Sequence, residues 1–171
     1  MKILVTYFSK TGNTRKVAEA IYQALIEPDK EIKPMQEVKY LADYSLIFCG
    51  FPVHSHSVPV SAQKFLKKIP SDSKAALFST HGSMTKGRMP MEAINNAIGI
   101  VKAEVLGHFT CRGEVEEDVI NRLMKEPQHQ AWAREALSAK AHPDSADLED
   151  ARFFAKSIMK KALSFEEYTN A

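Results

Sequence analysis

The sequence predicts an α/β protein with a doubly wound, five-stranded parallel sheet and helices on both of its faces. Apolar runs rich in β-forming residues stand at 3–8, 45–51 and 74–80, and a segment with helical spacing follows each run. The runs are apolar throughout rather than at every second residue, which is typical of strands buried on both sides. Strands that alternate with helices in this way are typical of parallel sheets.

The remaining elements follow the same alternation. A weaker strand is expected at 31–35, where Pro34 lacks a backbone donor and therefore favours the edge of the sheet. With that strand at the edge, the order 2-1-3-4-5 fits a three-layer sandwich. The other helices and the last strand are expected near residues 17–25, 60–68, 90–98 and 102–111.

The C-terminal third departs from this alternation. Residues 114–140 have helical spacing and carry no strand signal, so we expect a helical extension there. The sequence 142–147 is typical of a helix start, and the last helix should follow it. We expect the whole chain, 1–171, to form one domain that carries this extension.

Composition excludes several classes of protein. Hydrophobic residues make up 44% of the chain, and its two cysteines form no metal-binding pair. The net charge of +2 is too small to indicate nucleic-acid binding. The first apolar run ends at Phe8 without a cleavage site, and no run approaches the roughly 20 residues that span a bilayer. We therefore expect a cytoplasmic protein that binds neither nucleic acid nor membrane.

The strongest functional signal is the loop 9–14, between the first strand and the first helix. A helix start presents unpaired N–H groups and the positive end of the helix dipole. Hydroxyl groups at Ser9, Thr11 and Thr14, with Gly12 to let the backbone approach closely, complete a cradle for an anion.

Other α/β anion sites require residues that this loop lacks. A Walker A loop needs Gly-Lys before Ser or Thr, and a dinucleotide fingerprint needs GxGxxG. A receiver domain needs an aspartate at the end of the first strand, where Phe8 and Ser9 stand instead. A low-molecular-weight phosphatase needs a cysteine nucleophile in the loop, which has none.

The segment 7–14 resembles the phosphate loop of flavodoxins, with its hydroxyl-x-Thr-Gly-Asn-Thr core. The resemblance covers about residues 1–111 and the last helix. It implies a flavodoxin-like fold and a flavin mononucleotide (FMN) cofactor. It also implies that the phosphate is held by Ser9, Thr11, Gly12, Asn13 and Thr14, with Lys10 beside them.

Two further loops enclose the flavin ring in flavodoxins. The resemblance assigns ring contacts to Pro52, Val53 and His54 in the second loop and to Thr80, His81, Gly82 and Ser83 in the third. Arg112, which follows the last strand, is counted among the cofactor-binding residues because of its charge. Backbone N–H groups of the third loop are expected to face the pyrimidine edge of the ring. Neither loop contains Trp or Tyr, which departs from the electron-carrier pattern and leaves the ring open to a substrate.

Histidines in these loops are candidate proton donors to reduced flavin or to a substrate. His54 and His81 qualify because the unperturbed pKa of histidine is about 6.5. His54 and His56 together offer only two ligands, which is insufficient for a metal site.

Basic residues dominate the stretch that holds these loops. Between Tyr44 and Met91 the only acidic residue is Asp72, and this stretch contains six lysines or arginines. Lys86, Arg88 and Arg112 are expected to stabilise an anionic, fully reduced flavin. An acidic partner or substrate is the corresponding expectation.

The sequence thus predicts a redox protein in which FMN passes electrons from a reductase or a nicotinamide donor to an acceptor protein or a small conjugated substrate. An electron carrier and a small FMN-dependent oxidoreductase of the quinone-reductase type both fit. A different class also fits, because a flavodoxin-like fold can keep the anion loop yet bind no flavin and serve as a binding or scaffold module.

Overall fold

The computed structural model describes residues 1–54, 56–84 and 87–169. Five parallel strands form one sheet in the order β2-β1-β3-β4-β5, which confirms the predicted order. The strands are β1 (Ile3–Tyr7), β2 (Lys30–Pro34), β3 (Leu46–Pro52), β4 (Lys74–His81) and β5 (Glu104–Arg112).

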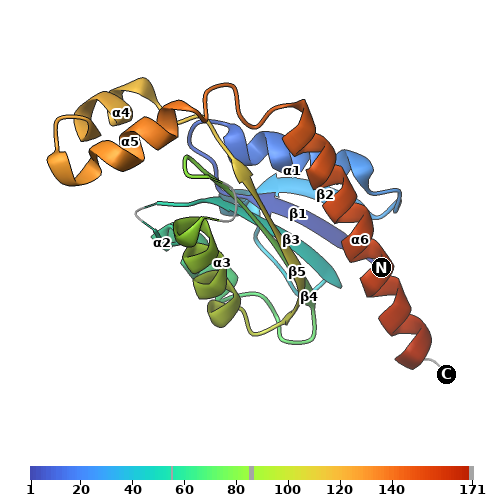
Figure 1. Cartoon of the computed structure of the whole chain (residues 1–171). Helices are drawn as coiled ribbons and strands as arrows, with labels where there is room; N and C mark the ends of the chain where they lie inside the picture. The colour runs from blue at the N-terminus through green and yellow to red at the C-terminus, as the bar shows by residue number, and fades with distance from the viewer. Residues whose placement is uncertain (55, 85–86, 170–171) are drawn as a thin grey trace.

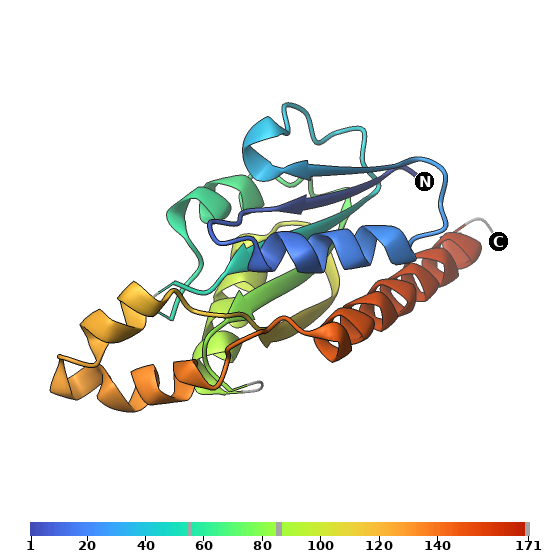
Figure 2. The same cartoon turned by 90° about the horizontal axis from the view of Figure 1, so that it is seen from above.

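Helices cover both faces of the sheet, as Figures 1 and 2 show. On one face lie α1 (Asn13–Ala24) and α6 (Ser145–Thr169), and on the other lie α2 (Val60–Leu66) and α3 (Arg88–Ile100). A short 3-10 helix, η1 (Met35–Glu37), follows the edge strand. The predicted three-layer α/β fold is therefore confirmed.

Each central strand contributes to two cores, because successive side chains of a strand point to opposite faces. Val5, Phe48 and Phe78 are buried in the core beneath α1 and α6. Leu4 and Ile47 are buried in the core beneath α2 and α3. Full burial of such a side chain contributes roughly 1.5–3 kcal/mol, so strands 1, 3 and 4 anchor the loops at their carboxyl ends firmly.

The edge strand differs from its neighbours, as its sequence predicts. All five residues of β2 are half-buried, and Pro34 is its last residue, opposite Tyr7 of β1. The first helix ends at Ala24, four residues before Pro28, because the chain turns into an extended conformation at Leu25.

The extension consists of α4 (Glu117–Leu123), the 3-10 helix η2 (Pro127–His129) and α5 (Gln130–Leu137). In both views these helices project beyond the carboxyl end of β5, outside the sandwich (Figures 1 and 2). They form a small core of their own around Ile120, Ala133 and Ala136.

No helix in the described part of the chain combines the length and the hydropathy that crossing a bilayer requires.

Candidate functional site

The first loop leaves the start of α1 open. Gly12 adopts φ +93°, a left-handed conformation that favours glycine, and its N–H donates to Ser9 Oγ over 3.1 Å. Lys16 makes the first helical bond, to the carbonyl of Gly12. Within the described residues, no side chain caps this helix start. The first-turn N–H groups are thus available to an anion, and nothing lies within 4 Å of the position that a Gly12 Cβ would take.

Two side chains of the first turn tie this loop to other elements. Thr14 is buried, and its hydroxyl lies 2.9 Å from the hydroxyl of Thr80 at the end of β4. The side-chain amide of Asn13 donates to the carbonyl of Glu114 over 2.8 Å. Asn13 is therefore turned toward the segment after β5, whereas Ser9, Lys10 and Thr11 remain partly or fully exposed.

The second loop is a narrow turn beside the first. His54 and Ser57 exchange two backbone hydrogen bonds of 2.9 Å each, and the N–H of Val53 donates to the carbonyl of Thr80. The exposed His54 ring meets Phe8 edge to face, with centroids 6.4 Å apart. Partial desolvation, and then the positive charge of Lys10, lower the pKa of His54.

A cavity of about 470 Å³ opens between the first and second loops and the start of α2. Phe8 and Pro59 supply apolar wall, while Lys10, His54 and Gln63 supply polar groups.

The third loop buries a neutral histidine. His81 is 6% exposed, and its Nδ1 lies 2.9 Å from the carbonyl oxygen of Ser83. Because a carbonyl only accepts, Nδ1 carries the proton. Burial, the largest cause, and the nearby Arg112 lower the pKa of His81 to about 4. Its Nε2 is buried without a partner among the described residues. At neutral pH the one ring proton lies on Nδ1 and is donated to the Ser83 carbonyl, so proton donation by His81 stays a prediction, which its burial disfavours.

The extension packs against the third loop. A Cβ on Gly82 would lie 2.5 Å from Val115 Cγ2 and 3.3 Å from Trp132 Cζ2. The Trp132 indole N–H donates to Ser83 Oγ over 2.9 Å, and the Met84 N–H donates to Glu135 Oε1 over 2.5 Å. Sequence reasoning missed these contacts, and the only Trp of the chain was the one signal available.

Arg112 fastens the extension and also contacts the third loop. The residue is 9% exposed, and its guanidinium donates to the carbonyls of Glu135 and Ser138 at 3.0 Å each. It also donates to Ser138 Oγ at 2.8 Å and to the Gly82 carbonyl at 3.4 Å. The guanidinium is thus held by protein oxygens, and a role of Arg112 beside the cofactor stays a prediction.

The model of the Flavodoxin domain family matches residues 4–156. This chain belongs to the flavodoxin family. The chain is 33% identical over 175 residues to the flavodoxin-like domain-containing protein BilS of Clostridioides difficile (strain CD3), which covers 95% of this chain and 98% of that protein.

Two solved structures share the flavodoxin fold at low sequence identity. Oxidised flavodoxin 2 from Bacillus cereus superposes with a TM-score of 0.61 at 21% identity and covers 94% of this chain and 99% of its own. A flavoprotein in complex with FMN from Lactobacillus acidophilus NCFM gives a TM-score of 0.52 at 19% identity and covers 64% of this chain and 92% of its own.

The basic groups expected around the ring of this flavodoxin-family protein are distributed differently in the structure. Arg88 is exposed and forms an ion pair with Glu92, with Nε 2.6 Å from Oε1. Lys86 lies outside the described residues. With Arg112 buried beneath the extension, Lys10 is the cation that lines the cavity beside the second loop.

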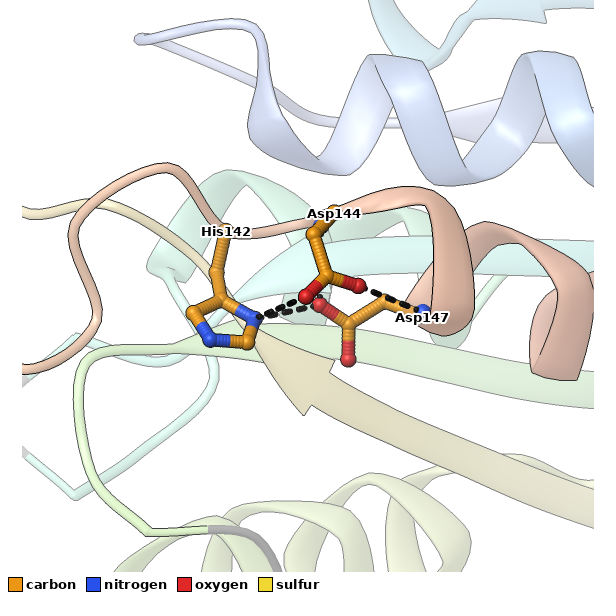
Figure 3. Close-up of side chains that lie close together, drawn as sticks. All are labelled: His142, Asp144 and Asp147. Atoms are coloured by element: carbon orange, nitrogen blue, oxygen red, sulfur yellow. Dashed lines mark hydrogen bonds and ion pairs between the residues drawn. The ribbon is translucent and has the colours of Figure 1, made fainter.

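A cluster of polar side chains lies at the N-terminal end of the last helix, α6, of this flavodoxin fold. Figure 3 shows His142 and the carboxylates of Asp144 and Asp147 turned toward one another. Asp144 Oδ1 accepts the N–H groups of Ala146 and Asp147, and Asp147 Oδ2 accepts the N–H of Asp144 over 2.9 Å and the His142 ring N–H over 2.5 Å. These bonds form a reciprocal helix cap, and the backbone N–H groups lower the pKa of Asp144.

Proposed function

We propose that this protein binds FMN and transfers electrons through it. The observation that carries the proposal is the uncapped start of α1 behind Gly12, where helix N–H groups, the Thr11 hydroxyl and the hydroxyl proton of Ser9 can take a phosphate monoester. Membership of the flavodoxin family and the fold shared with an FMN complex support it. When bound, FMN supplies the redox chemistry, and the protein supplies binding, orientation and electrostatics.

Different loops bind the two ends of the cofactor. The first loop and Thr14 hold the phosphate, and Pro52, Val53 and His54 face one side of the ring. The backbone of the third loop, from Thr80 to Ser83, approaches the ring's polar edge. His54 remains the candidate proton donor, because it is exposed beside the cavity whereas His81 is buried.

The cavity beside the second loop favours a small acceptor over a large protein surface. Its apolar walls suit a flat conjugated molecule, and Lys10 suits a negative group on that molecule. Three exposed lysines lie nearby in the chain, one in α2 at position 64 and two directly after it at positions 67 and 68. Together these charges favour an acidic acceptor or partner, whose rate of reduction should fall as salt is raised.

The test of the cofactor is a pair of titrations that follow flavin fluorescence and absorbance near about 450 nm. FMN is expected to bind at least roughly 100-fold more tightly than riboflavin, which lacks the phosphate, because charge-assisted hydrogen bonds are strong. Equal binding of the two flavins would contradict the phosphate site. No binding of either would favour a flavin-free scaffold instead.

The test of the electron path is steady-state oxidation of NADH or NADPH with a quinone acceptor. Turnover by the purified protein alone would identify an oxidoreductase. Turnover only after a flavin reductase is added would identify a carrier that a separate donor must reduce.

A further inference from the structure

We propose that helix α5 is part of the flavin site, and that Trp132 and Glu135 are positioning residues that hold the third loop against the ring. The inference rests on the proposed function, because the third loop is the one expected to meet the ring. It concerns the extension of residues 114–140, to which that function assigns no role.

Three consecutive residues of the third loop each contact a side chain of α5. Gly82 packs under Val115 and Trp132, Ser83 Oγ accepts the Trp132 N–H over 2.9 Å, and the Met84 N–H donates to Glu135 over 2.5 Å. The loop therefore has little freedom to change its backbone conformation independently of the helix.

The geometry of α5 explains how one helix makes these contacts. Positions 132, 135 and 136 are three and four residues apart, so their side chains share one face of the helix. Ala136 adds a third contact, since its Cβ would lie 3.4 Å from a Cβ on Gly82. A Cβ at position 82 would come closest to Val115, just before α4, and would also press on this face of α5, so packing rather than the φ angle favours glycine.

The helix is itself fixed to the sheet. Arg112, the last residue of β5, donates to the carbonyls of Glu135 and Ser138. The N–H of Gly113 donates to the carbonyl of His81 over 2.9 Å. Sheet, helix and loop form a closed chain of contacts, and the position of the third loop is set by the extension.

Such an arrangement affects ligand affinity through pre-organisation. A loop already held in its binding conformation loses less conformational entropy when a ligand binds. Loosening the hold of Trp132 on Ser83 should weaken flavin binding without touching the phosphate loop. FMN and riboflavin should consequently be weakened by the same factor.

The first experiment is a cycle of three variants in the full chain: Trp132→Phe, Ser83→Ala and the double substitution. Each single change removes one partner of the indole–hydroxyl bond and keeps most of the packing. Each should weaken binding of both flavins roughly 3- to 10-fold, and the double variant should bind no more weakly than either single variant. Leu137→Ala, an exposed change on the same helix, should leave affinity unchanged.

The second experiment separates the charge of Glu135 from its hydrogen bond. Glu135→Gln keeps an acceptor for the Met84 N–H and should retain flavin affinity, whereas Glu135→Ala should lose affinity. Because the glutamine removes a negative charge next to the loop, the flavin midpoint potential should rise in Glu135→Gln. Glu117→Gln, an exposed change on α4, should shift neither quantity.

The outcomes distinguish this proposal from the one on which it rests. A wild-type protein that binds no flavin would overturn the proposed function. A wild-type protein that binds FMN, with affinities unchanged in Trp132→Phe and Glu135→Ala, would overturn only the positioning role. Circular dichroism of each apo-variant establishes that lost affinity does not arise from lost folding.

Discussion

The hydroxyls of Thr14 and Thr80 lie 2.9 Å apart, and both residues are buried. This contact joins the first turn of α1 to the carboxyl end of β4, across 66 positions of sequence. It links the loop assigned to the phosphate with the loop assigned to the ring, so the spacing between the two ends of the cofactor site depends on it.

Replacing either threonine by valine should reveal this link. Thr14→Val and Thr80→Val each leave one buried hydroxyl without its partner, which should lower the free energy of unfolding by about 1–3 kcal/mol. Only Thr14 belongs to the phosphate loop, so Thr14→Val should weaken FMN binding more than Thr80→Val does. Urea unfolding of the apo-protein and FMN titration measure the two effects. Equal losses of affinity would mean that Thr14 acts only through Thr80.

Gly12 offers a test of backbone conformation at the phosphate loop. Alanine at this position meets no atom within 4 Å but must adopt φ +93°, which costs about 1–2 kcal/mol. Gly12→Ala should therefore lower stability and weaken FMN binding.

Gly99 provides the matched control for that change. It also has open space around the Cβ position, but it lies within α3 without a positive φ. Gly99→Ala should raise stability by roughly 0.5–1 kcal/mol and leave FMN affinity unchanged. Thermal unfolding and FMN titration of both variants separate the effect of a positive φ from the effect of an added methyl group. Similar changes in the two variants would contradict this account.

Buried His81 should make the apo-protein lose stability in mild acid. Its pKa in the fold is about 4, below the ordinary value of 6.5. As the pH falls from 6.5 to 4, the unfolded chain takes up a proton that the folded chain does not, so stability declines. The difference corresponds to a loss of roughly 3 kcal/mol across this window, and no further loss from this group is expected below it.

Urea unfolding at several pH values measures this decline. In His81→Asn, whose amide can still donate to the Ser83 carbonyl, the loss between pH 6.5 and 4 should be smaller by that amount. The exposed His108→Asn should keep the decline of the parent. If His81→Asn shows the same slope as the parent, His81 is not the group responsible.

Arg112 should hold α5 in place through the geometry of its guanidinium rather than through its positive charge. Arg112→Lys keeps a cation but loses the fork that reaches the carbonyls of Glu135 and Ser138. It should lower stability by about 1–3 kcal/mol and speed hydrogen exchange in α5. Arg122→Lys, on the exposed surface of α4, should change neither. If hydrogen exchange in α5 stays at the parent's rate in Arg112→Lys, the positive charge of Arg112 matters and its forked geometry does not.

Local sequence was sufficient for the framework of this protein. The apolar run before Ser9 and the helical spacing after it define a strand, a loop and a helix start, and Pro34 indicates the edge strand. These features follow from side-chain periodicity and backbone freedom within a few residues. The loop 9–14 could be proposed as an anion site from sequence for the same reason.

The surroundings of the third loop were decided only by packing between distant segments. Ser83 meets Trp132 across 49 positions, and Asn13 meets Glu114 across 101. No local pattern encodes such contacts, because the helical spacing of 114–140 says that helices form but not which surface they cover. Arg112 is buried against that extension, and His81 is held by Ser83 and Gly113. Their chemistry is consequently a property of the tertiary structure.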